Sequence, residues 1–513
     1  MREKLTDRDR YASARVARLD RPVDSPLGRL TRDGPPVPIT RAAERSPASS
    51  HDKRVANLEA VFDAFEIDDG AVLSFHHHYR NGDWVLAQVL DIARSRGLRG
   101  LTLAASSLFP VHAPIVPLIE DGTIAHVVTN YMRGPVADAI ARGALRGTTL
   151  LQSHGGRARA IAARQLQIDA AFVAAPLARP DGAATGRGGA LACGPLGYPA
   201  VDAKFARQTA VLAAEISPAP LPHIDIPAGN VDALVACPQI GTTEGIRSGA
   251  TQASNSPGAR TIAKLVASTV SAAGFLRDGL SLQSGSGGYS LGAVSQIGET
   301  MAEQGIVGSF LSGGITGVHA RLLSEGRFAR IRDVQCFDLD AVHSSLHHPE
   351  HHMMDAEQYA SPLAAHPAVA DLDVLLLGAV EVDAQFNVNV VRSAGGTILG
   401  GPGGHPDAAA GAKLRIITTD LTGGGYAKLV PDVTCVSTPG RDVDIVVTPH
   451  GIAVNPERPA LAADLRRAGL PLRAFAELAA QAAADANPLA HPMERTEPVA
   501  YIEDRQGALL DWI

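Results

Sequence analysis

Short apolar runs alternate with segments of helical spacing along most of this 513-residue chain. This alternation constrains the fold more than any other feature of the sequence, because strands that alternate with helices build βαβ units around a mainly parallel sheet. In the first half we expect helices over 55–65, 84–96 and 135–141. We expect strands over 71–75, 101–104, 126–129, 170–175 and 209–214.

A second alternating region runs from residue 260 to about residue 477. Its strand candidates are 374–378, 414–418, 433–437 and 444–448, and the alanine- and leucine-rich segment 459–484 is typical of a helix. Because the two halves share one pattern, we predict an α/β protein of two tandem open α/β/α domains. Ligands of such folds bind beyond the carboxyl ends of the strands, so we expect the site in the cleft between the domains.

We place the predicted domains at residues 55–225 and 260–485, joined by a polar, proline-bearing passage at 226–259. A C-terminal tail follows at 486–513. Residues 1–54 form an arginine- and proline-rich arm with weak apolar periodicity, which predicts a surface-draped or partly disordered segment. A solvated extension without a function of its own is the favoured interpretation of this arm.

The composition excludes several functional classes. Aromatic residues make up 4% of the chain and the formal net charge is -7, which argues against a nucleic-acid partner. The N-terminus lacks the apolar segment of a signal peptide, and no run of eighteen apolar residues occurs, so we predict a cytoplasmic protein without membrane contact. The cysteines are isolated and predict reduced thiols: Cys193, Cys237, Cys336 and Cys435.

Two glycine-rich loops open onto helical patterns, one at 283–292 and the other at 400–404. Glycine lets a ligand approach the main chain, and a helix start offers unpaired N–H groups to an anion or oxyanion. Two tight turns without a ligand remain the alternative. Pro402 and Pro406 have no N–H group, which leaves fewer donors in the second loop. The candidate donors are Gly285, Gly287, Gly288, Gly401, Gly403, Gly404 and His405.

Several segments with a distinctive sequence occur between residues 55 and 480. They are Ser74–Asp83, Ser106–Pro114, Thr129–Tyr131, Gly134–Ala139, His154–Ile161, Cys193–Tyr198, Val334–Asp340, Glu381–Asp383, Phe386–Val390 and the loop at 400–404. These segments resemble the citrate lyase alpha chain family and occur in the family's order. The family is more distantly similar to acetyl-CoA hydrolases and CoA-transferases, which have two tandem α/β domains.

The resemblance implies an acyl-exchange reaction, in which an acetyl thioester and citrate give a citryl thioester and acetate. The thioester belongs to CoA or to the phosphoribosyl-dephospho-CoA group of a carrier protein, and no cofactor is bound permanently. It also implies a beta chain that cleaves the citryl thioester, a gamma chain that is the acyl carrier, and a homo-oligomer within the larger complex. The family is expected to use a mixed anhydride rather than a covalent enzyme intermediate.

Citrate is ionised near neutral pH, so its site needs cations and N–H donors. Arg157 and Arg159, which follow His154, Gly155 and Gly156, are the candidate carboxylate ligands, because a guanidinium bonds both oxygens of a carboxylate. Arg80 and Arg133 could add charge. Pairing of these arginines with acids of the same chain is the alternative. We also expect His154, Gly155, Gly156, Asn130, Asn387 and His405 to bind the substrate, Gly285 and Gly401 to bind the thioester, and Gly287, Gly288, Gly403 and Gly404 to act in catalysis.

Related CoA-transferases carry a nucleophilic glutamate, and the position expected for it holds Arg321. A guanidinium cannot be acylated in this way, which favours the anhydride route. Glu381 remains a catalytic carboxylate candidate, and its alternative is a structural acid at a strand end. A general acetyl-CoA hydrolase or CoA-transferase that uses Glu381, and a scaffold subunit that only binds partner chains, are the competing functional hypotheses.

The triplet His76–His78 raises the question of a metal site. Neighbouring residues of a strand face opposite sides, so only His76 and His78 could share one ion, and no third ligand stands nearby in the sequence. We therefore predict no metal, and a structural or anion-contacting role for the triplet.

Overall fold

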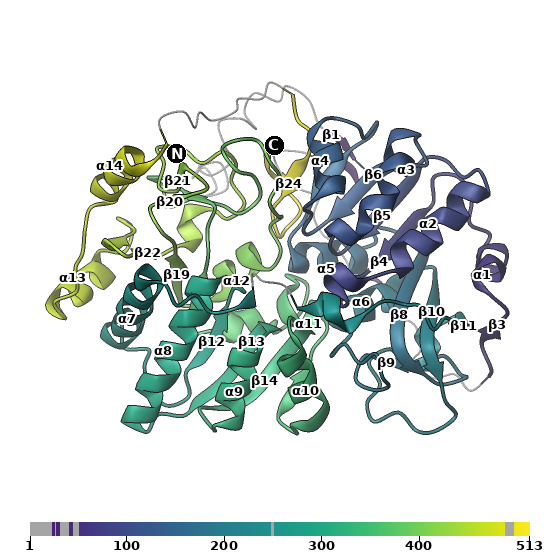
Figure 1. Ribbon diagram of the computed structural model, residues 1–513, viewed down its shortest axis with the longest axis horizontal. Helices are drawn as coiled ribbons and strands as arrows, with labels where there is room; N and C mark the ends of the chain where they lie inside the picture. The colour runs from purple at the N-terminus through teal and green to yellow at the C-terminus, as the bar shows by residue number, and fades with distance from the viewer. Residues whose placement is uncertain (1–22, 26, 31–40, 45–50, 248–250, 488–496) are drawn as a thin grey trace, which may run out of the picture.

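The computed structural model describes residues 23–25, 27–30, 41–44, 51–247, 251–487 and 497–513. Two α/β units lie side by side, and each is built on its own sheet (Figure 1). The chain completes most of the first unit before it enters the second, and its last described segment returns to the first. The α/β class predicted from the alternating pattern is confirmed.

The first sheet has eleven strands, and its central strands are parallel. In spatial order they are β25 (Leu509–Trp512), β24 (Tyr501–Glu503), β7 (Thr149–Leu151), β6 (Ile124–Thr129), β5 (Leu101–Ala105), β4 (Val72–Phe75), β8 (Ala170–Ala178), β10 (Gln208–Ile216), β11 (Ala233–Ala236) and β3 (Arg54–Val55), with β9 (Ala184–Thr185) paired to β8. Burial on both faces explains the continuous apolar runs, since β5 is buried along its whole length.

The helices of the first unit follow its strands in the chain. They are α1 (Leu58–Phe65), α2 (Val85–Ser95), α3 (Val116–Glu120), α4 (Pro135–Ala141), α5 (His154–Ala162) and α6 (Gly197–Phe205), with 3-10 turns η3 (Arg80–Gly82), η4 (Pro110–Ile115), η5 (Ala228–Asn230) and η6 (Thr243–Ile246). Helix α1 is capped by the Asn57 side chain, which accepts the N–H of Ala60. These helices and the strands confirm the predicted elements of the first half to within a few residues.

The second sheet has eight strands, parallel except for its last pair. Their order is β15 (His351–Met353), β14 (Phe328–Cys336), β13 (Gly308–Ile315), β12 (Ser281–Ser284), β16 (Val374–Leu377), β19 (Leu414–Thr418), β22 (Ile445–Thr448) and β23 (Gly451–Val454). The helices are α7 (Pro257–Ala272), α8 (Gly288–Gln304), α9 (Gly317–Ser324), α10 (Leu339–His347), α11 (Ala356–Ala360), α12 (His405–Gly411), α13 (Pro459–Arg467) and α14 (Phe475–Asp485), with 3-10 turns η8 (Ala368–Asp371) and η9 (Gly440–Asp442). Three small hairpins, β1–β2 (Val23–Ser25, Gly28–Leu30), β17–β18 (Glu381–Val382, Val388–Asn389) and β20–β21 (Thr422–Gly423, Tyr426–Ala427), lie outside the two sheets.

One predicted strand of the second half is wrong, and one segment predicted to be helical is interrupted. Residues 433–437 are not a strand, because their N–H groups bond to side chains and loops: Thr434 donates to Glu381 and Val436 donates to Asp511. The segment 459–484 is two helices rather than one, since the chain turns at Gly469, which has a φ of 74°. A run of β-branched residues therefore does not form a strand here, because side chains rather than a neighbouring strand accept the N–H groups of Thr434 and Val436.

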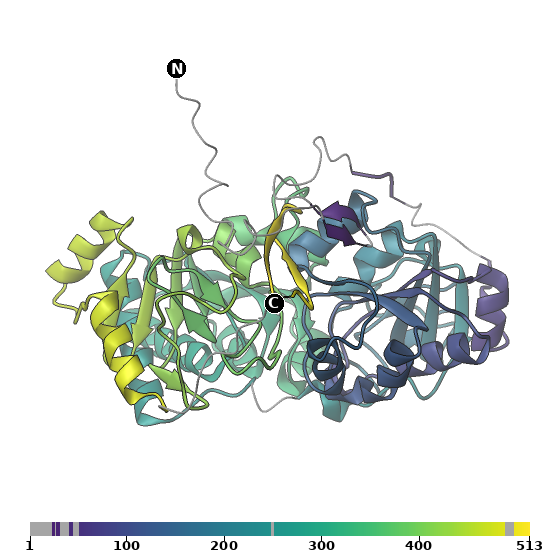
Figure 2. The same ribbon diagram turned by 90° about the horizontal axis from the view of Figure 1, so that it is seen from above.

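The predicted domain limits remain a prediction, but two of the linking segments contain strands of the first sheet. Strand β11 falls in the passage 226–259 and pairs with β10. The tail supplies β24 and β25, and β24 pairs with β7 (Figure 2). Most of the arm 1–54 lies outside the described residues, although Arg41 forms an ion pair with Glu357 of α11. Within the described residues no helix has the length and apolar character needed to span a bilayer.

A buried carboxylate joins the two units. Asp407, in the first turn of α12, is fully buried and accepts hydrogen bonds from Ser153 Oγ at 2.8 Å and from the N–H of Gly155 at 2.7 Å. Arg505 of the returning C-terminal segment adds a contact at 3.4 Å. Ser153 also caps α5, because its hydroxyl accepts the N–H of Gly156. The start of α5 is thus fixed by the Asp407 side chain at the start of α12.

Replacing Asp407 with Ala should lower the free energy of unfolding by about 3 kcal/mol, because two buried donors lose their acceptor. Chemical denaturation of the full chain measures this effect. Asp464→Ala is the matched control, since Asp464 pairs with Arg467 on the surface of α13, where an ion pair contributes little. Equal unfolding midpoints for the two variants would contradict the role given to Asp407.

Candidate active site

A cavity of about 380 Å³ lies at the seam between the two units, at the carboxyl ends of strands of both sheets. Its walls follow β4, β5, β6 and β7 of the first unit and β12 and β14 of the second, as expected for ligand sites of parallel α/β sheets. The lining residues are His77, Arg80, Asn81, Ser107, Phe109, Pro110, Tyr131, Arg133, His154, Gly245, Arg247, Ser286, Phe337 and Gly403. We call this cavity the arginine pocket.

The charge of the arginine pocket is entirely positive. Arg80, Arg133 and Arg247 line it, and none of the lining residues is an aspartate or glutamate. Arg133 and Arg247 are exposed, and neither forms an ion pair with a carboxylate among the residues that the structure describes. Burial, with a smaller contribution from the neighbouring Arg133, lowers the pKa of Arg80 to about 10, so Arg80 stays charged at neutral pH. The pocket is therefore built to hold an anion with several negative groups.

Two neutral imidazoles complete the wall on the side of the first unit. His77 Nδ1 lies 2.6 Å from Ser106 Oγ, and the ring of His154 lies 4.6 Å from the ring of Tyr198. Burial lowers the pKa of His77 well below its usual value and that of His154 to about 3, with Arg157 as the second cause for His154. Neutral imidazoles can donate a hydrogen bond to a bound carboxylate without carrying charge.

The histidine triplet divides between the pocket and the core. His78 Nε2 donates to the carbonyl of Ala174 at 2.9 Å, and His76 Nε2 lies 3.5 Å from a carboxylate oxygen of Asp202. Both have structural partners, whereas His77 between them lines the arginine pocket. The triplet follows the end of β4 rather than lying in a strand, so different partners, not strand alternation, separate the three rings.

Arg157 and Arg159, the predicted citrate ligands, do not line the arginine pocket. Arg157 forms a bidentate bond with the buried carboxylate of Asp202, at 2.7 and 2.6 Å. Arg159 pairs with the buried Glu503 at 2.5 Å. Helix α5 is buried along almost its whole length, so its arginines face protein on every side. The alternative, pairing with acids of the same chain, describes both residues, although the acids are buried rather than on the surface.

Other predicted site residues also have structural partners. Asn130 Nδ2 donates to the carbonyls of Gln152 and Ser153, and Asn387 bonds Asp383 and Gly440. His405 lies between Thr438 Oγ1 at 2.7 Å and the carbonyl of Gly378 at 3.1 Å. The structure thus places Asn130 behind the pocket wall and leaves Asn387 and His405 out of the lining.

The second glycine loop is fixed against the first unit. Gly403 donates its N–H to the carbonyl of Asn130 at 3.1 Å, and its own carbonyl accepts the N–H of His154 at 2.9 Å. A Cβ at Gly401 would lie 2.2 Å from the Asn130 carbonyl oxygen, so only glycine fits there. The N–H of His405 donates to Pro402. Of the predicted donors in this loop, Gly401 and Gly404 have no backbone acceptor among the described residues.

The first glycine loop reaches the pocket through Ser286 and ends at the N-terminus of α8. Gly285 donates its N–H to Leu376 O at 2.7 Å, which removes it from the candidate donors. Gly287 and Gly288 stand at the start of α8, where N–H groups have no intrahelical acceptor. These two remain candidates for contact with an oxyanion.

Glu381 belongs to a different cavity of about 370 Å³, which Lys428 and Leu399 also line. Its carboxylate is buried and accepts three hydrogen bonds: from Asn389 Nδ2 at 2.8 Å, from Thr434 N at 2.7 Å and from Thr434 Oγ1 at 2.7 Å. These bonds describe a carboxylate held in a structural role at the start of β17. Arg321 lies on α9, more than half exposed and 4.0 Å from Glu325, outside the lining of the arginine pocket.

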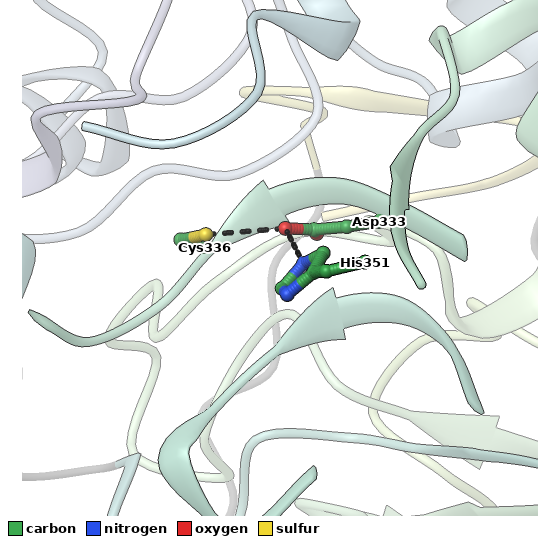
Figure 3. A group of neighbouring side chains, drawn as sticks. All are labelled: Asp333, Cys336 and His351. Atoms are coloured by element: carbon green, nitrogen blue, oxygen red, sulfur yellow. Dashed lines mark hydrogen bonds and ion pairs between the residues drawn. The ribbon is translucent and has the colours of Figure 1, made fainter. Parts of the chain in front are cut away.

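One group among the described residues could hold a metal ion: Asp333, Cys336 and His351, all buried (Figure 3). Cys336 Sγ and His351 Nε2 each lie 3.1 Å from Asp333 Oδ2, and His351 Nδ1 bonds Ser344 Oγ at 2.9 Å. Each polar atom therefore has a partner within the protein, and hydrogen bonding accounts for the group without an ion. All four cysteines are free thiols.

Sequence reasoning missed several pocket residues, namely Ser107, Phe109, Tyr131, Arg247, Ser286 and Phe337. Ser107, Phe109 and Tyr131 follow strands whose carboxyl ends meet at the cleft, so their place after apolar runs was the available signal. Arg247 stands in the polar passage before α7, where no local pattern marks an approach to the first unit.

A model of the family "Citrate lyase, alpha subunit (CitF)" matches residues 51–513. The citrate lyase alpha chain of Escherichia coli (strain K12) is 38% identical over 461 residues, 90% of this chain and 90% of the relative. That of Klebsiella pneumoniae is 37% identical over 484 residues, 93% of this chain and 95% of the relative.

Solved structures agree with these relatives. A Streptococcus mutans protein assigned as the alpha subunit of citrate lyase, crystallised in complex with citrate, is 36% identical, with a TM-score of 0.88, and the match covers 93% of this chain and 95% of that one. A Pseudomonas malonate decarboxylase hetero-tetramer in complex with malonate matches with a TM-score of 0.61 at 17% identity, over 86% of this chain and 96% of that chain. The second likeness concerns the fold alone.

The position of His405 generates a pH-dependent prediction. Burial lowers the pKa of His405 from 6.5 to about 4. Between pH 4 and pH 6.5 the unfolded chain therefore binds a proton at His405 that the folded chain does not bind. The stability contributed by His405 is complete above pH 6.5 and is lost as the pH falls toward 4. His405→Gln should therefore be less stable than the wild type at pH 7.5, and this gap should shrink by about 2 kcal/mol at pH 5. Denaturation at both pH values measures the gap, and an unchanged gap would contradict the assigned environment.

Proposed function

The chain belongs to the citrate lyase alpha subunit family, and we propose that it performs the family's acyl exchange with citrate bound in the arginine pocket. The chain is accordingly a citrate:acyl-carrier-protein transferase. In the reaction, an acetyl thioester and citrate are converted to a citryl thioester and acetate. The resemblance seen in the sequence is thereby confirmed at the level of the family and its activity.

The charge of the arginine pocket is the observation that carries the proposal. Three guanidinium groups and no carboxylate line a cavity of about 380 Å³, which falls in the size range of small-molecule sites, about 300–1,000 Å³. Citrate brings three carboxylates, and each arginine offers a fork of N–H groups that matches one carboxylate. The citrate complex of the Streptococcus mutans relative, 36% identical, supports the same ligand class.

The chemistry requires an oxyanion to form twice. A citrate carboxylate attacks the acetyl thioester carbonyl, and collapse of the tetrahedral oxyanion expels the thiolate and leaves an acetyl–citryl anhydride. The thiolate then attacks the citryl carbonyl of the anhydride and expels acetate, so that all atoms are accounted for. Preorganised N–H donors stabilise such oxyanions, each contributing about 3 kcal/mol. Gly287 and Gly288 at the start of α8, together with Gly401 and Gly404, are the donors we propose.

The thioester partner is the acyl carrier of the citrate lyase complex, as family membership implies. We propose that its prosthetic group is phosphoribosyl-dephospho-CoA, that Gly285 and Gly401 mark the loops it approaches, and that CoA can replace the carrier. We further propose that a citryl-cleaving beta chain and the carrier gamma chain assemble with a homo-oligomer of this chain. The Pseudomonas relative of the same fold is itself a hetero-tetramer.

A route through an acylated glutamate has less support. Glu381 is the carboxylate candidate, yet its carboxylate accepts hydrogen bonds from Asn389 and Thr434, and it lines a different cavity from that of the three arginines. A nucleophile needs a lone pair directed at the carbonyl carbon, and each accepted hydrogen bond lowers the reactivity of that oxygen. We therefore retain direct exchange through the anhydride. A pure scaffold role would not require an arginine-lined pocket.

Arg133→Ala and Arg247→Ala should each raise the KM for citrate roughly tenfold to a hundredfold, since a charged hydrogen bond of about 1.5–3 kcal/mol is lost. Both arginines are exposed, so the thermal midpoint should stay near that of the wild type. Arg157→Ala is the contrasting variant: it leaves the buried Asp202 carboxylate without its cation, and should lower stability by about 3–5 kcal/mol. Wild-type citrate kinetics in both Arg133→Ala and Arg247→Ala would rule out the pocket.

Glu381 provides the test of the direct route. After incubation with acetyl-CoA, hydroxylamine trapping and peptide mass spectrometry should find Glu381 unmodified. Glu381→Gln should retain part of its activity, because the amide keeps the contact to Thr434 but changes its charge. A trapped adduct on Glu381 together with complete loss of turnover in the variant would establish the covalent route instead.

A further inference from the structure

The guanidinium of Arg80 lies over two aromatic rings that come from different units. Its central carbon is 4.5 Å from the centre of the Phe337 ring and 5.4 Å from the centre of the Phe109 ring. Phe109 follows β5 of the first unit, and Phe337 follows β14 of the second. All three residues line the arginine pocket. Residues of both units therefore contact the same cation at the seam.

The backbone at Arg80 is unusual. Its φ of 54° lies in the left-handed region, which disfavours residues other than glycine, asparagine and aspartate. Such a conformation persists only where the surroundings hold it, and it is concentrated at ligand sites. Here the carbonyl of His77 accepts the Arg80 N–H at 2.8 Å and also accepts Gln335 Nε2 at 2.9 Å. One carbonyl thus holds both the turn that presents Arg80 and the end of strand β14.

Contacts within the second unit fix the position of the Phe337 ring. Gln335, two residues earlier, donates its N–H to Asp333, the residue that also bonds Cys336 and His351 in Figure 3. The register of β13 against β14 shifts between Gly313 and Gly314. A Cβ at Gly314 would lie 2.3 Å from the Phe337 ring, so the ring occupies the space that any other residue at Gly314 would fill.

A guanidinium that stacks on aromatic rings is held in one plane, and its N–H groups point outward within that plane. Arginine stacks on aromatic faces in this way, and lysine cannot reproduce both the stacking and the fork. We infer that Phe337 is a positioning residue for substrate binding: its ring fixes the plane of the Arg80 guanidinium so that the fork faces a carboxylate in the pocket. This inference rests on the proposed function, because it takes citrate to be the ligand of the arginine pocket.

A second cation–aromatic contact, within the second sheet, gives the matched control. The guanidinium of Arg332, in β14, lies 5.2 Å from the ring of Phe310, in β13. Neither of these residues lines the arginine pocket. Loss of the Phe310 ring therefore removes a contact of the same chemistry from the second unit without touching the proposed substrate site.

The experiment compares Phe337→Leu, Phe337→Tyr and Phe310→Leu with the wild type in the full chain, with acetyl-CoA and citrate as substrates and with thermal unfolding as the stability readout. Phe337→Leu should raise the KM for citrate about tenfold, within the range of desolvated cation–π contacts, while kcat changes little. Phe337→Tyr keeps the ring and should restore the KM to within about twofold. Phe310→Leu should lower the thermal midpoint and leave the KM unchanged. If Phe337→Leu does not fold, Phe337→Met supplies the same loss of the ring.

A KM for citrate in Phe337→Leu equal to that of the wild type, or a KM in Phe337→Tyr as high as in Phe337→Leu, would overturn the positioning role. Arg80→Lys separates this failure from failure of the proposed function. An unchanged citrate KM in Arg80→Lys would remove Arg80 from the substrate site and with it the arginine pocket. A raised KM in Arg80→Lys with a normal KM in Phe337→Leu would overturn only the role of Phe337.

Discussion

The carboxylate of Asp407 is the interaction on which the rest of the site depends. It ties the first turn of α12 to the first turn of α5, and so it fixes the two units relative to each other at the place where their strand ends meet. Burial raises the pKa of Asp407, because the carboxylate loses its hydration when it is kept away from water. The hydrogen bonds from Ser153 and Gly155 offset this loss of hydration. Because the Gly403 loop immediately precedes α12, the same interaction also holds the glycines against Asn130.

Positive charge is used for two different purposes around this seam. Arg157 and Arg159 are buried in α5 and neutralise Asp202 and Glu503, so they stabilise the packing of the first unit and of the returning C-terminal hairpin. Another three arginines line a cavity that contains no acid among its walls. A buried ion pair neutralises its own charges, whereas guanidinium groups that line a pocket without a carboxylate attract an anion. The difference between the two sets is one of partners, not of residue type.

Much of the fold could be predicted from the sequence, because buried parallel strands appear as apolar runs and the helices between them show apolar residues at helical spacing. The site could be predicted only in outline. The glycine loop at 400–404 was found because close approach of Gly401 to Asn130 demands glycine. The choice of Arg157 over Arg133 was not supported, since a motif shows which arginines exist but not that Asp202 lies beside one of them. Arg247 and Phe337 depend on contacts between distant segments, which no local pattern records.

The most direct test of the account is a crystal structure of the full chain with citrate. The account predicts citrate in the cavity at the seam, with its carboxylates within hydrogen-bond distance of the guanidinium groups of Arg80, Arg133 and Arg247, at about 2.7–3.2 Å. It also predicts that the Asp202–Arg157 pair is unchanged. Citrate bound to Arg157 and Arg159, or located in the cavity beside Glu381 and Lys428, would contradict the central claim that the arginine pocket is the substrate site.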